Sequence, residues 1–407
     1  MAIAEGSSTY FAYKVEGTPN TQESGSGGTV LRRVTGQLDL AKAEVTSAEK
    51  RTDFQETNVN HGTRSVNWSI AGELFGADYE AFWAALLRKD FAAVSTISAS
   101  SGDGFTISSG VLTRAAGGAQ SFITDGLYEG LVVRFTNLTA TANNDRNLRI
   151  ASMTATTLTL VAVDGGAAVA DSTSSETATL VIPGEFTFVP STAHTSKTFT
   201  IEKHDTKTDS SQVGRGCKVG AGELSVQPDQ PVGLTFSGLG IDRAGFAAGA
   251  APVLTSPTAA GTGPAMSAGI GNVRVGGTSV AVITGLTLSL DLGVNNAPAV
   301  FSNVSPDVFY GRTLAATGQI TVLKEGNTLA DYFDNETEVA LDFFIAAPGS
   351  EPRAFYNLYL KRVKLNSADE DDPDGAVVQT SSFRALKAAT ATGVNPTTLL
   401  LQDSSIS

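Results

Sequence analysis

The sequence predicts a mainly β protein with two similar domains in tandem, each with one flanking helix, and a small all-β module inserted in the first. Gly contributes 42 of 407 residues and charged residues only 17 %, a composition typical of short strands joined by tight turns. Apolar and polar residues alternate with period two over much of the chain. A strand followed by a helix occurs at residues 61–89 and returns, more weakly, at 311–333.

Changes in composition divide the chain into five segments. The first is polar and rich in Gly and Ser, which predicts an arm outside any core. The insert has short strand patterns interrupted by Gly, Asn and Asp. The expected segments are an amino-terminal arm (1–28), a first domain (29–93 with 185–243), the insert (94–184), a Gly- and Ala-rich linker (244–279), and a second domain with a carboxyl-terminal arm (280–407).

The strand and helix at residues 61–89 are the clearest elements. Val66, Trp68 and Ile70 alternate with polar residues, as in a strand with one buried face. Residues 77–88 carry an apolar stripe at helical spacing, and Phe82 and Trp83 lie on it. Aromatic residues on one helix face usually belong to a core, so we expect these two to be core markers without chemistry.

A polar connection of about fourteen residues precedes this strand, which is long for a loop inside a compact domain. Such loops are often functional, and a plain surface loop is the alternative. The candidate contact residues are Glu49, Arg51, Asp53 and Glu56 within the connection and Glu44 shortly before it.

The second half of the chain repeats the strand and helix of the first half. At a displacement of 250 positions, Phe82 falls on Tyr332 and Trp83 on Phe333. We therefore expect Tyr332 and Phe333 to be the core markers of the second helix.

Beyond the insert the match continues at a smaller displacement. Phe199 and Ile201 fall on Leu358 and Leu360, 159 positions later. The two displacements differ by 91 (250 − 159), which is the length of the segment 94–184. A duplicated domain interrupted in its first copy explains both displacements.

Composition and motifs argue against several classes of protein. The net charge of −13 does not suit a surface that grips phosphates. No apolar run approaches the ~18 residues that span a bilayer, and the amino terminus lacks the pattern of a signal peptide, so we expect a protein kept in a cytoplasm. One cysteine, Cys217, and three histidines in a chain without known catalytic motifs predict neither an enzyme nor a cofactor.

The densest acidic cluster, Asp369 to Asp374, suggests calcium at first sight. Aligned as a calcium loop from Glu370, the cluster has Ser381 at the twelfth position, where a bidentate Glu belongs. A solvated turn between strands is the favoured interpretation.

The chain resembles the tail tube proteins, or major tail proteins, of phages with long non-contractile tails, in the variety with a duplicated tube domain. The matching features are the amino arm, the strand, polar loop and strand at 30–74, the helix at 77–88, and the carboxyl-terminal pattern FRALKAATATGVNPTTLLLQ. The insert at 94–184 is similar to the β modules that decorate phage tail proteins.

The resemblance implies half-barrel β-sandwich domains whose inner sheets join around a ring, and rings that stack through the loops at 43–60 and 293–310 and the terminal arms. With two domains per chain, three chains would close a ring of pseudo-six-fold symmetry, and six chains are the alternative. It also implies a virion protein that assembles in the host cytoplasm. Its partners would be other copies, the tape measure and tail terminator proteins, and DNA passing an acidic lumen without sticking; no membrane is implied.

Two other functions remain open at this point. A carbohydrate-binding or adhesin-type β protein would use the insert as its glycan-binding face. An enzyme ranks third, because nothing in the sequence places a base beside a nucleophile. We also expect the insert to lie on the outside and to be dispensable for ring closure.

Overall fold

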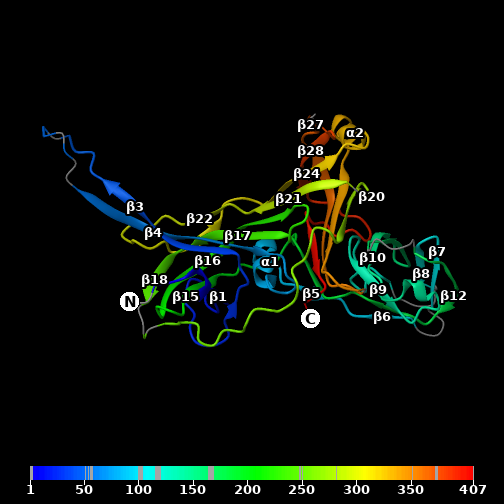
Figure 1. The fold of residues 1–407 in the computed structure, drawn as a ribbon, viewed down its shortest axis with the longest axis horizontal. Coiled ribbons are helices and arrows are strands. Elements are labelled where there is room, and N and C mark those ends of the chain that lie inside the picture. Colours follow the sequence, from blue (N-terminus) through cyan, green and yellow to red (C-terminus); the bar gives the residue numbers. More distant parts are fainter. Residues whose placement is uncertain are drawn as a thin grey trace.

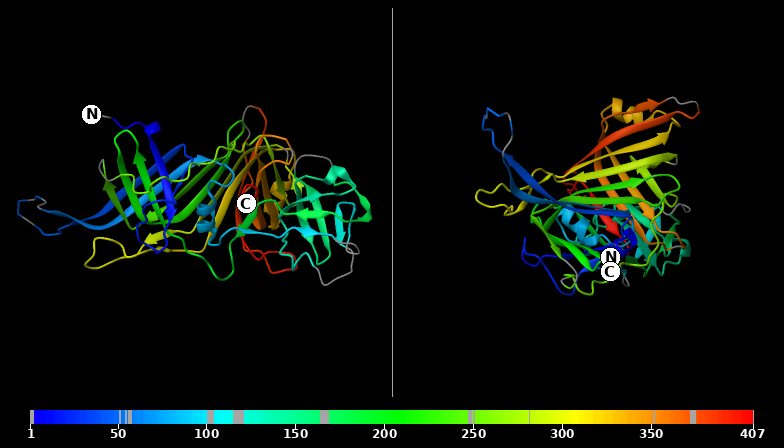
Figure 2. Two further views of the ribbon diagram at one scale, coloured as in Figure 1. Left: turned by 90° about the horizontal axis from the view of Figure 1, so that it is seen from below. Right: turned by 60° about the vertical axis from the view of Figure 1, so that its left-hand side comes forward.

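A curled antiparallel sheet runs through both halves of the chain, and a separate smaller sheet lies at one end (Figure 1). The computed structural model describes residues 3–50, 52, 53, 55, 58–99, 104–114, 121–163, 169–246, 249, 251–280, 282–350, 352–371 and 375–406. Figure 2 shows the large sheet from two further sides. The protein is thus mainly β.

The large sheet holds most of the strands. They are β1 (Thr9–Val15), β2 (Thr29–Val30), β3 (Thr35–Thr46), β4 (Val59–Glu73), β5 (Ala92–Ala93), β14 (Glu185–Phe188), β15 (Phe199–Asp205), β16 (Ser210–Val226), β17 (Gly233–Gly240), β18 (Asp242–Phe246), β19 (Gly271–Val275), β20 (Thr278–Ser279), β21 (Ile283–Asp291), β24 (Ala315–Leu323), β25 (Val339–Ala346), β26 (Phe355–Leu365), β27 (Asp369–Asp371), β28 (Val378–Leu386) and β29 (Leu400–Asp403).

The remaining strands form two smaller sheets. The insert sheet contains β6 (Ile97–Ser98), β7 (Phe105–Ser108), β8 (Val111–Arg114), β9 (Val132–Thr136), β10 (Leu148–Met153), β11 (Thr157–Ala162), β12 (Ser172–Glu176) and β13 (Thr179–Val181). A hairpin pairs β22 (Val294–Asn296) with β23 (Val308–Tyr310). The α-helices of the described chain are α1 (Glu80–Leu87) and α2 (Thr328–Asp334).

Within the large sheet, one series of neighbouring strands crosses from the first half to the second. We call it the main sheet, and its order is β3, β4, β17, β16, β21, β24, β28 and β27, all antiparallel. The halves meet where residues 221–226 of β16 pair with residues 286–291 of β21. We call this pairing the internal joint.

A second layer covers the core side of the main sheet. In the first half it consists of β1, β15, β18 and the first part of β16, and in the second half of β25, β29 and the first part of β26. Trp68 of β4 and Phe199 of β15 belong to the same buried cluster. The two layers therefore enclose a core, as in a β-sandwich.

Strand pairing in the second half repeats that of the first. Leu38 lies opposite Trp68 in the β3–β4 hairpin, and Leu288 lies opposite Gly318 in the β21–β24 hairpin. Both partners of the second pair come 250 positions after those of the first. The register of the two hairpins is therefore the same.

The second displacement expected from the sequence, 159, is wrong. Phe199 lies opposite Cys217 in the β15–β16 pair, and Val339 lies opposite Val363 in the β25–β26 pair. Both pairs have a register irregularity after this position. Phe199 thus corresponds to Val339, 140 positions later, and not to Leu358. Period-two alternation is the same in every half-buried strand, so it did not distinguish β25 from β26.

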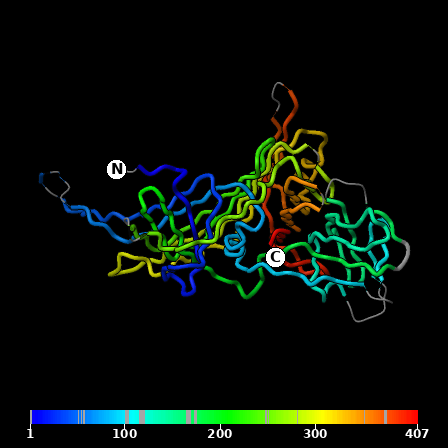
Figure 3. The backbone as a smooth tube through the Cα atoms, turned by 60° about the horizontal axis from the view of Figure 1, so that its bottom comes forward, coloured from blue at the N-terminus to red at the C-terminus, as the bar shows by residue number. Residues whose placement is uncertain are grey.

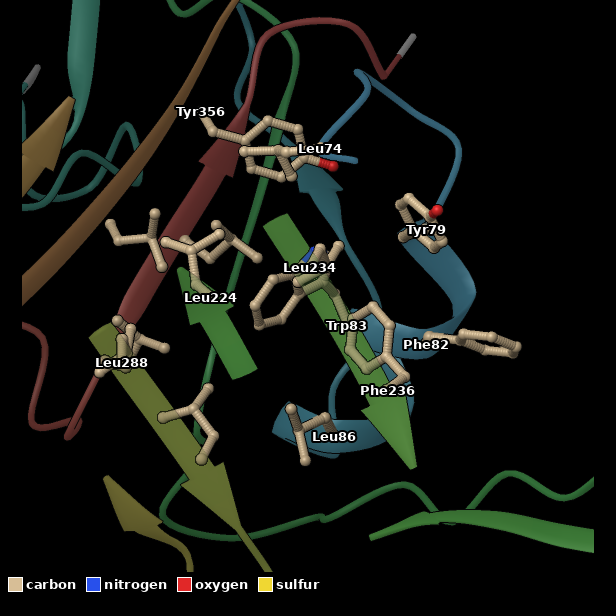
Figure 4. Packing of buried hydrophobic residues seen from close by; sticks show 14 of the residues in the cluster. Leu74, Tyr79, Phe82, Trp83, Leu86, Leu224, Leu234, Phe236, Leu288 and Tyr356 are labelled. Carbon is tan, nitrogen blue, oxygen red and sulfur yellow. The ribbon is translucent and has the colours of Figure 1, made fainter. Parts of the chain in front are cut away.

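Helix α1 packs its aromatic side chains against β17 (Figure 4). The ring centroids of Trp83 and Phe236 are 5.1 Å apart at 82°, and Phe82 meets Phe199 edge-on at 5.2 Å. Both residues of the helix are buried. The helix is shorter than the expected 77–88, because Ala77 has a positive φ of 63° and Arg88 ends the helix in the left-handed conformation.

Helix α2 packs less deeply, and the expected core position of Phe333 is wrong. Leu329 is the buried residue of α2 and Tyr332 is partly buried, but Phe333 is 39 % exposed. Residues 325–327 before the helix and 335–338 after it are exposed. Since α2 lies at the end of the sheet, one of its two aromatic positions faces solvent.

Both expected terminal arms contain core strands. β1 pairs with β15 along its whole length and buries Phe11. β29 lies between β14 and β26, with Leu401 buried. The expectation of arms is therefore wrong for these two stretches, whose apolar residues are few but lie on strands.

The Gly- and Ala-rich stretch 244–279 is held against both halves of the chain. β19 and β20 lie within it, and β19 pairs with β25. The buried carboxylate of Glu202 accepts hydrogen bonds from the backbone N–H groups of Val253 and Leu254, both at 2.8 Å. Two such bonds to a buried carboxylate fix the path of the connection.

The insert sheet leaves the first half after β5 but packs against the second half (Figures 1 and 3). Gln402 of β29 makes hydrogen bonds with the backbone of Val132, at 2.8 and 3.0 Å. Arg149 of β10 and Asp342 of β25 form a buried ion pair. The insert thus contacts β25, β26 and β29 through polar and apolar side chains.

Candidate functional site

The main sheet has one face on the core and one open face, which we call the polar face. Because directly paired residues of neighbouring strands share a face, the pairing register identifies its members. They are at least partly exposed and include Gln37, Asp39, Asn67, Ser69, Glu73, Thr235, Ser237, Glu223, Ser225, Thr287, Ser289, Asp291, Thr317, Gln319, Thr321, Asp369, Asp371, Thr380, Ser382 and Arg384.

Most of the polar face is uncharged. Hydroxyl and amide side chains cover it, and Arg384 is the one cation among the residues named above. Strong attraction between a protein and DNA comes mainly from Lys and Arg beside phosphates. The face therefore offers little grip for a nucleic acid. The charged residues of this face are mostly acidic, since Asp39, Glu73, Glu223, Asp291, Asp369 and Asp371 stand against Arg384.

The β3–β4 hairpin extends away from the rest of the fold (Figure 1), and Glu44 lies on β3 with the other candidate contact residues following in the sequence. Glu44, Glu49 and Asp53 are exposed there. Arg51 and Glu56 lie outside the described residues. The strands are longer than expected, so the tip comprises residues 47–58.

The corresponding loop of the second half, residues 293–310, does not project in the same way. The Nζ of Lys218 lies 3.1 Å from the Oδ1 of Asp307, and the backbone N–H of Arg64 donates to the carbonyl of Asn303 at 2.8 Å. Gly220 leaves space for Val294, because a Cβ on this glycine would lie 2.4 Å from its Cγ2. This loop is held on the first half.

The main sheet has an open edge at each end. β3 pairs with β4 and β27 pairs with β28, and no second partner is found for either strand within the described parts of the chain. Asp369, Glu370 and Asp371 of β27 are exposed. Open edges present unpaired backbone N–H and C=O groups and invite pairing with another strand. Sequence patterns pointed to the hairpin tip but gave no sign of these edges.

The residues that carry reactive chemistry are few and lie apart. His204 is buried and its Nδ1 lies 2.9 Å from the hydroxyl of Ser211, whereas His61 and His194 are exposed. Among the described residues there is no group of three or more metal-ligating side chains. Asp372 and Asp374 of the candidate calcium loop lie outside them.

Cys217 is expected to resist thiol reagents in the native protein. Its side chain is fully buried, and burial raises the pKa of the thiol well above its usual value, so little reactive thiolate forms. Titration with a chromogenic disulfide should detect about one thiol per chain in urea and almost none without it. Rapid reaction of the native protein would contradict the described burial.

A sequence model of phage tail tube proteins matches residues 6–385, which is nearly the whole chain. The chain belongs to the phage tail tube protein family. A search of curated proteins finds no match. The tail tube assignment makes the chain a structural component of a phage virion tail, and the mainly β sandwich fold agrees with it. No helix in the described part of this tail tube protein is long and apolar enough to cross a membrane.

Proposed function

We propose that the chain polymerises into stacked rings that form the tail tube, with the polar face lining the lumen through which the genome reaches the host. The observation that carries this proposal is the main sheet, which spans both halves, has its core on one side only and ends in an open edge at each end. A sheet of this kind closes when copies join edge to edge, which removes the exposed edges.

We further propose that three chains form one ring. The strand pairing of the first half recurs in the second, so each chain supplies two of six similar positions. A ring of six chains is the alternative. The insert packs on the second layer, away from the polar face, and on this proposal it lies outside the tube.

Stacking is proposed to use the β3–β4 hairpin, with Glu44 on β3 and Glu49, Arg51, Asp53 and Glu56 in the connection that follows it. Its extension away from the fold supports this role. The tape measure protein inside the tube and the tail terminator at its end are the expected further partners. Assembly would take place in the host cytoplasm.

Electron microscopy of the purified protein tests the proposal. Tubes, or rings that stack when tail partners are added, are expected. Persistent monomers under all conditions, together with virions whose tubes lack this protein, would contradict the proposal.

Cations on the polar face are expected to slow genome passage. The substitutions Thr287→Lys, Ser289→Lys and Thr317→Lys place three ammonium groups on neighbouring strands of the face. Each cation near a phosphate releases counterions, so the effect should weaken as salt rises. The measurement is the rate of genome ejection in vitro from virions built with the variant, which should fall at least several-fold at low salt.

Matched lysines on the insert serve as the control. Ser108, Thr113 and Thr156 are exposed hydroxyl residues of the insert, and replacing them by Lys adds the same charge outside the proposed lumen. Ejection from these virions should match the wild type. Equal rates for both variants would argue against the polar face as the lumen wall.

A further inference from the structure

The internal joint shows how one half of the chain attaches to the next. Residues 221–226 of β16 run antiparallel to residues 286–291 of β21, with Ala221 opposite Asp291. The first half supplies its last main-sheet strand and the second half supplies its first. A joint between two copies of the chain would bring together the counterparts of these two strands.

The counterpart of β16 in the second half is β26 with β27. In the first half β16 pairs with β17, and in the second half β26 and β27 pair with β28 in the same way. A residue of β26 or β27 comes 146 positions after its equivalent in β16. The register of β16 shifts between Val219 and Ala221, and the register along β28 shifts between Leu365 and Asp369, which is the corresponding place. Lys218 of β16 corresponds to Lys364 of β26.

The counterpart of β21 is β3, at the displacement of 250 established by the two hairpins. Both counterparts are the open edges of the main sheet described above. β27 and most of β3 are also exposed. The chain thus carries the two sides of a second joint at opposite ends of one sheet.

We propose that β3 of one copy pairs antiparallel with residues 367–371 of the next copy, in the register of the internal joint. In the internal joint Ala221 lies opposite Asp291. The counterpart of Ala221 is Ser367 (221 + 146), and the counterpart of Asp291 is Ala41 (291 − 250), so Ser367 of one copy lies opposite Ala41 of the other. Asp371 then lies opposite Gln37. This inference rests on the proposed assembly into rings and adds the strands and the register of the contact between copies.

The same correspondence gives the hairpin a place on the neighbouring copy. In the internal joint, Val294 covers Gly220, and Lys218 holds the loop that follows β22. The counterpart of Val294 is Glu44, and the counterpart of Lys218 is Lys364. Glu44 of one copy therefore lies over Asn366 of the next, two residues beyond Lys364, where opposite charges favour the contact. In the single chain, Lys364 makes an ion pair with Glu336 that is exposed and so easily exchanged.

Cysteine cross-linking tests the register. Directly opposed residues of antiparallel strands have Cα atoms about 4.5–5.5 Å apart, within the range of a disulfide. We expect the double variant Ala41→Cys with Ser367→Cys, oxidised as assembled tubes with oxidised glutathione, to give covalent multimers of up to three chains on a non-reducing gel. Each single variant should remain a monomer, and buried Cys217 should not contribute.

Two further variants make the test decisive. Gln37→Cys with Asp371→Cys is a second pair in the same register and should also cross-link. Gln37→Cys with Ser367→Cys is displaced by four residues, roughly 13 Å along a strand, and should not. Wild-type tubes whose two in-register variants fail to cross-link, or cross-link no better than the displaced pair, would overturn the joint but leave the tube proposal standing. Absence of wild-type tubes would overturn both.

Discussion

Asp342→Ala should lower the free energy of unfolding by about 3–5 kcal/mol, because it leaves the guanidinium of Arg149 buried without its partner. Both side chains are nearly inaccessible, at 4 % and 3 % exposure. Burial lowers the pKa of Arg149 to about 10, which still leaves the guanidinium charged at neutral pH. Urea unfolding of unassembled protein, followed by circular dichroism, measures the loss.

The matched control removes both charges. Arg149→Leu with Asp342→Leu takes away the pair without stranding either member, so it should cost markedly less than Asp342→Ala. A double variant as unstable as the single one would show that the apolar packing at this contact matters more than the unpaired charge.

This contact also bears on the insert, which the sequence suggested is dispensable for ring closure. Deleting residues 94–184 would remove the partners of Asp342, Asn357 and Gln402 and uncover Tyr359. We therefore expect the deletion to destabilise the second half unless these residues are replaced as well. If the simple deletion abolished assembly, the cause would be the destabilised second half. The result would not show that the insert contributes to the contact between copies.

Trp83→Ala is the second large effect, with an expected cost of about 3–5 kcal/mol. The indole packs edge-on against Phe236 and is 1 % exposed, so its removal leaves a cavity between α1 and the main sheet. The change in urea midpoint, again by circular dichroism, gives the cost.

Phe333→Ala is the matched control for Trp83→Ala, because the two residues occupy the same position of the repeated unit. Phe333 is 39 % exposed, so its truncation should change stability by about 0.5 kcal/mol or less. Comparable losses for the two variants in unassembled protein would contradict the described packing of α2.

The sequence alone was sufficient to predict the strands and the helix that have a clear hydrophobic periodicity. Val66, Trp68 and Ile70 predicted β4, the apolar stripe predicted α1, and the displacement of 250 gave the true register of the two hairpins. The prediction of a mainly β tail tube protein is confirmed. These features depend on patterns among residues close in the sequence, and such patterns can be recognised in a single sequence.

The features that failed depend on which strands meet. Alternation alone did not distinguish β25 from β26, and so gave a false displacement of 159. β1 was missed because it lies in a stretch that is otherwise polar and rich in Gly and Ser. The strand pattern at the carboxyl end was recognised, but its pairing between β14 and β26 was not. The open edges and the polar face exist only once the strand order is known, since both are properties of pairing between distant segments.

Electron cryomicroscopy of assembled tubes tests the proposed ring. We expect rings of three chains with pseudo-six-fold symmetry, a sheet that continues from β27 of one chain into β3 of the next, and a lumen lined by Thr287, Ser289 and Thr317. A tube whose lumen is lined by another surface, or whose chains meet without joining these sheet edges, would contradict it.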